Sequence, residues 1–92
     1  MTHGGDHCFK KNSQIICKEA DAALVDPYRR TLVRLNPAGL RVWQLLDGAR
    51  STESIIDIME AEFEVDIDTL GKDVRDFLKE LARREMIERC SA

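Results

Sequence analysis

The sequence has 92 residues, which leaves room for one domain, and its 43% hydrophobic and 34% charged residues are typical of a folded chain in water. A net charge of -3 argues against a partner such as nucleic acid, whose phosphates favour a basic protein. No apolar run approaches the roughly 20 residues that span a bilayer, and the start lacks the apolar core of a secretory signal, so we expect a cytoplasmic protein that binds no membrane.

The first residues carry almost no apolar side chains. We therefore expect a flexible arm over residues 1–14 and a folded domain over residues 15–89. The arm contains His3, His7 and Cys8, but their spacing matches no common zinc pattern and a fourth ligand is missing. The sequence predicts neither a metal site nor a cofactor.

Cys8, Cys17 and Cys90 are odd in number and form no CxxC unit. Reduced thiols in a cytosolic protein fit this pattern best. Cys17 lies within an apolar strand pattern, and we expect it to be a small core residue.

Residues 15–35 read as a three-stranded antiparallel meander. Two short apolar runs, at residues 15–17 and 22–25, are separated by charged residues, and Asp26 with Pro27 predicts the turn after the second. In the third strand, residues 29–35, successive side chains point to opposite faces of the sheet. Every second residue should therefore face the core, and the residues between should point away from it. The expected core-facing residues are Thr31, Val33 and Leu35, and the outward-facing ones are Arg30, Leu32 and Arg34.

The second half of the chain predicts three helices. Asn36 followed by Pro37 is a strong start signal, Ser51 or Thr52 can cap a second helix, and Asp66 or Asp68 can open a third. Gly48 is a suitable stop for the first helix. Apolar residues recur at helical spacing in all three: Val42, Trp43, Leu45 and Leu46, then Ile55, Ile56, Met59 and Phe63, then Leu70, Val74, Phe77, Leu78 and Leu81. Met86 and Ile87 should return to the core.

Three strands followed by three helices define an α+β domain in which the helices cover one face of the sheet. One face and one edge of the sheet then stay open, and the edge would also permit dimerisation. The third strand is rich in arginine, so we hypothesise that it attracts an acidic, extended peptide. Residues 51–71, in contrast, carry acidic residues and no Lys or Arg, which is typical of a solvated face.

The string LNPAGLRVWQLLDGARSTESI, residues 35–55, resembles the "LN-x-x-(A/G)-x-x-(I/V)-W-x-L-x-D-G" core of the PqqD family. A DV-x-x-FL-x-x-L pattern follows, from Asp73 to Leu81. Together with the order of elements, the resemblance covers residues 15–89. Two positions depart from the members of the pyrroloquinoline-quinone pathway: Leu46 precedes Asp47-Gly48 in place of cysteine, and Glu85-Met86 stands in place of Gly-Trp. The resemblance therefore implies the module, and the pathway could be this one or that of another ribosomally made peptide.

Members of the family are winged-helix-like units that bind the leader segment of a ribosomally made precursor peptide and present it to a modifying enzyme, often a radical-SAM protein. The resemblance implies that the leader adds as a strand beside the third strand, in a groove shared with the third helix. The peptide-binding residues expected by position are Arg30, Thr31, Leu32, Val33, Arg34, Leu70, Val74, Arg75, Leu78 and Lys79.

The sequence also bears on three other functions. An enzyme is not expected, because the histidines lie in the arm and the chain has no phosphate loop, nucleophile elbow or HExxH motif. A winged-helix shape could read DNA, but the third helix carries both charges nearly equally and the acidic second helix would repel phosphate. The acidic helix could instead dock the chain on an enzyme without any peptide.

Overall fold

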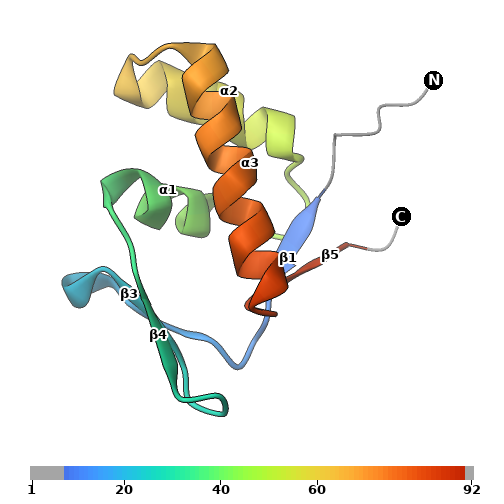
Figure 1. Ribbon diagram of the computed structural model, residues 1–92. Coiled ribbons are helices and arrows are strands. Elements are labelled where there is room, and N and C mark those ends of the chain that lie inside the picture. Colours follow the sequence, from blue (N-terminus) through green and yellow to red (C-terminus); the bar gives the residue numbers. More distant parts are fainter. Residues whose placement is uncertain (1–7, 91–92) are drawn as a thin grey trace.

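The computed structural model describes residues 8–90, which form a three-stranded sheet, three helices and a second, two-stranded sheet (Figure 1). This α+β arrangement confirms the expected fold class. The elements are β1 (Phe9–Lys11), β2 (Ile16–Lys18), a 3-10 helix η1 (Glu19–Asp21), β3 (Ala23–Asp26), β4 (Thr31–Arg34), α1 (Pro37–Leu45), α2 (Thr52–Phe63), α3 (Ile67–Arg83) and β5 (Ile87–Arg89).

The strands β2, β3 and β4 form the predicted antiparallel meander in that order. The turn between β3 and β4 depends on Asp26, whose Oδ1 accepts hydrogen bonds from the backbone N–H groups of Tyr28 at 3.0 Å and Arg29 at 3.1 Å. These bonds, led by that from the Arg29 N–H, hold the pKa of the Asp26 carboxyl below its usual value. The carboxylate that fixes the turn is 2% exposed.

Cross-strand register divides the meander into two faces. Cys17, Leu24 and Val33 lie opposite one another and pack against the helices. In β4, the parity of burial confirms the expectation: Thr31 and Val33 are half-buried while Leu32 is 54% exposed. The helices therefore cover one face of this sheet.

Each helix begins at a capping side chain that the sequence indicated. Asn36, Ser51 and Asp66 each accept a hydrogen bond from the backbone N–H three residues further on, at 2.7, 3.1 and 3.0 Å respectively. α1 ends at Leu45, and Gly48 lies in the turn beyond it with φ +81°, a conformation that glycine adopts without steric cost.

The core lies between the meander and the helices. Trp43 is 4% exposed, and the expected return of Met86 and Ile87 to the core is confirmed by their burial. The remaining core residues are Ile15, Leu24, Leu35, Val42, Leu45, Leu46, Ile55, Ile56, Met59, Leu70, Val74, Leu78 and Leu81. No helix within residues 8–90 is both long and apolar enough to cross a membrane.

The second sheet was not expected. Residues 9–11 lie within the stretch predicted as a loose arm, yet they form β1, which pairs antiparallel with β5. The physical reason is that Phe9 packs against the core while the backbone of β5 supplies a ladder of hydrogen bonds. His3 and His7 lie outside the described residues.

Candidate peptide-binding site

The strand β4 lies at an edge of the meander, and among the described residues it pairs only with β3. One hydrogen bond shows which residues of β4 bond to β3. The N–H of Leu35 donates to the backbone oxygen of Ala22 at 2.7 Å, and this pair lies one residue beyond the paired residues Ala23 and Arg34. In an antiparallel pair the hydrogen-bonded positions alternate. The backbone N–H and C=O groups of Thr31 and Val33 therefore face β3, and those of Leu32 and Arg34 point to the open edge.

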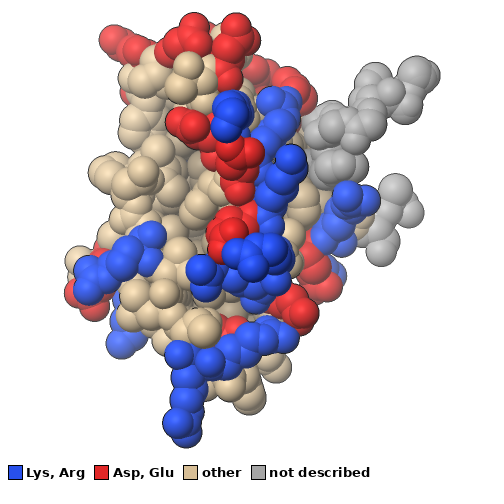
Figure 2. All heavy atoms as spheres, in the orientation of Figure 1, with Lys and Arg blue, Asp and Glu red and all other residues tan. Residues whose placement is uncertain are grey.

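Two arginines at this edge carry charge without an ion-pair partner in the described part of the chain. They are Arg30, at the start of the strand with φ +55°, and Arg34, which is exposed. Arg29 differs, because it pairs with Asp26 and Glu85. Figure 2 shows basic side chains gathered over the end of the molecule that holds the β3–β4 hairpin. Such charges would attract carboxylates of an incoming segment.

An apolar pocket of about 140 Å³ lies between α1 and α3. It opens close to the end of β4, since Asn36 follows that strand by two residues. Gly39 permits the close approach of the helices: a β-carbon there would lie 3.4 Å from Cζ of Phe77. The lining residues are Asn36, Ala38, Gly39, Val42, Leu70, Asp73, Val74 and Phe77. Figure 2 shows a surface without charged side chains on the α1 side of α3.

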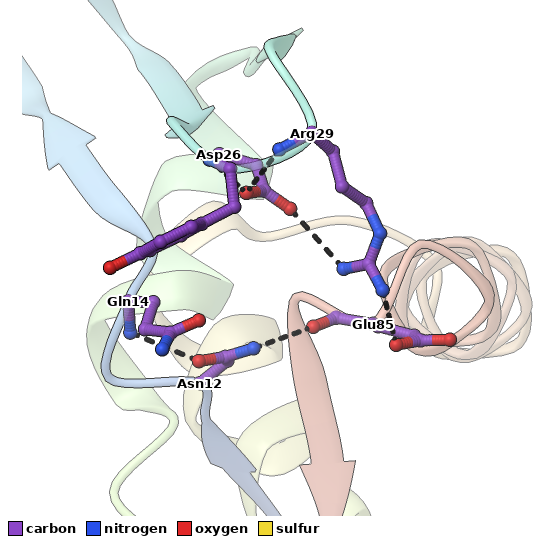
Figure 3. A network of polar contacts seen from close by, with 6 residues as sticks. Asn12, Gln14, Asp26, Arg29 and Glu85 are labelled. Carbon is purple, nitrogen blue, oxygen red and sulfur yellow. Dashed lines mark hydrogen bonds and ion pairs between the residues drawn. The ribbon is translucent and has the colours of Figure 1, made fainter.

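A polar network holds the β3–β4 hairpin against the end of α3 (Figure 3). Arg29 donates to Oδ2 of Asp26 at 3.4 Å and to Oε1 of Glu85 at 2.6 Å. The backbone oxygen of Glu85 accepts from Nδ2 of Asn12 at 3.0 Å, and Asn12 Oδ1 accepts from the N–H of Gln14. The network therefore connects the hairpin that carries β4 to Glu85, in the turn that follows α3.

The structure divides the expected residues of α3 into three groups. Leu70, Val74 and Leu78 are all buried in the core, and the first two also line the pocket near β4. Arg75 pairs with Glu53 of α2, and Lys79 borders a different hollow, beside β1 and β5. The physical reason is helical geometry: positions 75 and 79 lie about 200° around the helix from positions 73 and 77.

The α3 flank that borders the pocket is formed instead by Asp73 and Phe77. Both belong to the pattern that carried the family resemblance, but their orientation toward α1 was not recognised from the sequence. Their spacing of four residues, one turn apart on a common flank, was the available signal.

The described residues offer no arrangement for metal chemistry: within residues 8–90, no three His, Cys, Asp or Glu side chains gather closely enough to hold an ion. What the site offers is a row of free backbone groups, two unpaired cations and an apolar pocket. These are the elements that recognise an extended peptide by backbone pairing and side-chain insertion.

Comparisons with known proteins agree with this geometry. A search of curated protein sequences finds no match. A solved structure described as "TbiB1 in Complex with the TbiA(beta) Leader Peptide" is similar, with 32% sequence identity and a TM-score of 0.76, over 90% of this chain and 99% of that chain. The family model for coenzyme PQQ synthesis protein D (PqqD) matches residues 21–87. The chain therefore belongs to the PqqD family.

Proposed function

We propose that this chain binds the leader segment of a ribosomally made precursor peptide as an added strand on β4 and presents it to a modifying enzyme. The observation that carries this function is the open edge, where the backbone groups of Leu32 and Arg34 have no partner strand in the described part of the chain. An antiparallel or parallel peptide strand would satisfy them. The similar chain TbiB1 is described in complex with a leader peptide, which supports this occupant.

The edge of β4 and the pocket would recognise different features of the peptide. Backbone bonds to Leu32 and Arg34 would pair with any extended segment, so they give affinity with little sequence preference. The pocket at Val74 and Phe77 would accept an apolar side chain, and Arg30 with Arg34 would favour acidic residues nearby. The expected roles of Thr31 and Val33 would be indirect, because they hold β4 on β3.

The role proposed is binding and not catalysis. Membership of the PqqD family supports it, and the site contains no nucleophile with an adjacent base among the residues that line it. The modifying enzyme would be of radical-SAM type, as the family resemblance implies, and the complex would form in the cytoplasm.

The direct test uses peptides with altered backbones. Synthetic leader segments from the precursor peptides encoded beside this gene are titrated by fluorescence anisotropy, with the TbiA(beta) leader as a reference. In the segment that binds, single backbone N–H groups are then replaced by N-methyl groups along the sequence. Strand addition predicts that affinity falls at every second position and stays nearly constant at the positions between, because alternate N–H groups face β4. Equal losses at successive positions, or none, would reject strand addition.

A further inference from the structure

Two cysteines from opposite ends of the sequence meet beside the β1–β5 sheet. Cys8 precedes β1 and Cys90 follows β5, and the register that pairs Phe9 with Arg89 places them opposite each other one step further on. The N–H of Cys90 donates to the backbone oxygen of Cys8 at 2.8 Å, and the two Sγ atoms lie 2.6 Å apart. Both residues are half-buried, and neither is part of a disulfide bond.

Backbone from a third segment holds this pair in place. Sγ of Cys90 donates to the backbone oxygen of Gly48 at 3.2 Å, and Cys8 forms a β-bridge with Ser51. Gly48 and Ser51 belong to the connection between α1 and α2. The two thiols are thus held in register by main-chain contacts from three segments.

This arrangement meets the requirements of a disulfide. Facing residues of an antiparallel pair have β-carbons about 4.5–5.5 Å apart, and a disulfide needs about 3.5–4.5 Å, so a small approach of the strands is sufficient. Cys17 provides an internal contrast. It lies in β2 on the sheet face that packs against the core, and no other described cysteine is hydrogen-bonded to it.

We propose that Cys8 and Cys90 form a thiol–disulfide exchange site that takes a low-molecular-weight disulfide such as oxidised glutathione. The thiolate of one cysteine attacks a sulfur of the oxidant, the oxidant's S–S bond breaks, and one glutathione thiolate leaves. The second cysteine loses its proton and attacks the protein sulfur of the mixed disulfide, which releases the second glutathione. Two protein thiols are oxidised to one disulfide, and one oxidised glutathione is reduced to two thiols.

The electrostatics of the pair set its rate. The hydrogen bond between the two thiols raises the pKa of Cys8 to about 11, and burial and the charges of Cys90 and Asp47 act in the same direction. Because only the thiolate reacts, exchange at neutral pH is slow without a catalyst. A brief exposure to oxidant therefore leaves the two thiols unchanged, and a sustained exposure is needed to convert them.

Oxidation would join residues that are 82 positions apart in the sequence. A link across so long a loop restricts the unfolded chain strongly. It would also fasten β1 to β5, the strand that follows α3 after a short turn. This inference does not rest on the proposed function, because it concerns the side of the molecule that carries the second sheet and requires no peptide.

The test uses the full chain in buffers with increasing ratios of oxidised to reduced glutathione. After equilibration, free thiols are alkylated and the protein is digested with trypsin, which cuts after Lys10 and Arg89. We expect a linked pair of peptides, residues 1–10 with residues 90–92, and a mass decrease of about 2 Da for the two hydrogens lost. Cys17 should remain alkylated. The Cys17→Ser variant should behave as the unmodified chain.

Two further measurements keep the result interpretable. The unfolding midpoint of the oxidised chain should rise by about 10 °C over the reduced chain, and the Cys90→Ser variant should show no such rise. Alkylation of both thiols at every ratio, linkage through Cys17, or disulfide-linked dimers as the main product would overturn the proposal. A linked chain with an unchanged midpoint would also contradict it, because the folded chain would then have to be strained to hold the bond.

Discussion

The substitution Leu32→Pro removes one backbone donor from the open edge of β4. Leu32 is the informative position, because the ladder phase turns its N–H away from β3 and its side chain is 54% exposed on the outer face of the sheet. Proline is tolerated on an edge strand when the missing N–H faces outward. The substitution should therefore leave the fold intact and weaken the peptide complex.

The expected magnitude follows from a single lost hydrogen bond. The bond itself contributes about 0.5–1.5 kcal/mol, and the peptide carbonyl left without a donor adds to the loss when water cannot reach it. A total of about 1–2 kcal/mol corresponds to a dissociation constant raised about 5- to 30-fold. The matched control is Leu32→Ala, which retains the N–H and removes only the exposed side chain, and it should change the affinity less than about threefold.

The assay is anisotropy of a labelled leader segment, with circular dichroism and thermal unfolding of both variants. Val33→Pro serves as the contrast, since it removes an N–H that faces β3 and should destabilise the fold. Equal affinities for Leu32→Pro and Leu32→Ala, with both variants folded, would refute the assignment of the edge.

Three further predictions follow from the charges and the core. Reversing Arg30 and Arg34 to glutamate should lower the affinity for an acidic leader by about fivefold or more at low salt and flatten its salt dependence, as titrations at two ionic strengths would show; an unchanged salt slope would exclude these arginines. Leu81→Ala should lower the free energy of unfolding by about 2–5 kcal/mol in urea titrations, because Leu81 is 0% exposed, and a loss below about 1 kcal/mol would contradict the packing. The lowered pKa of Asp26 means that its contribution to stability is complete above its ordinary value of 3.8 and is lost as the pH falls through the lowered value. Asp26→Asn should therefore reduce the urea midpoint more at pH 7 than at pH 2.5, which lies below the ordinary pKa, and equal losses at both would contradict this.

Much of the fold could be predicted because its signals are local. The caps at Asn36, Ser51 and Asp66 use a side chain and an N–H only three residues away, so sequence spacing carries the whole interaction. The outward parity of Leu32 in β4 likewise follows from alternation along one strand. The open edge was predictable in turn from the number of strands and their order.

The β1–β5 sheet could not be predicted, because its two strands lie near opposite ends of the chain and neither strand has a recognisable sequence pattern of its own. Each strand has three residues, too few for an alternation to be recognised. The partner of Phe9 is Arg89, and no local pattern indicates a pairing across that separation. The contact between Cys8 and Cys90 could not be predicted for the same reason.

The residues expected on α3 lie on different sides of that helix. The periodicity of apolar residues identifies the buried stripe of α3 that contains Val74. Which elements the residues on either side of that stripe contact depends on how the helix is rotated against its neighbours. That rotation is set by the contact of Phe77 with α1 at Gly39 and by the ion pair of Arg75 with α2. Both are tertiary contacts, so the sequence did not indicate that Arg75 and Lys79 lie away from the pocket between α1 and α3.

Backbone amide hydrogen exchange by NMR, with and without a binding leader segment, tests the central claim most directly. In the free protein, the amides of Thr31 and Val33 should be protected by β3, while those of Leu32 and Arg34 should exchange rapidly. Strand addition predicts that the segment selectively slows exchange at Leu32 and Arg34. Saturation with peptide that leaves these two amides unprotected, while shifts gather on α2, would contradict the account and assign binding to another surface.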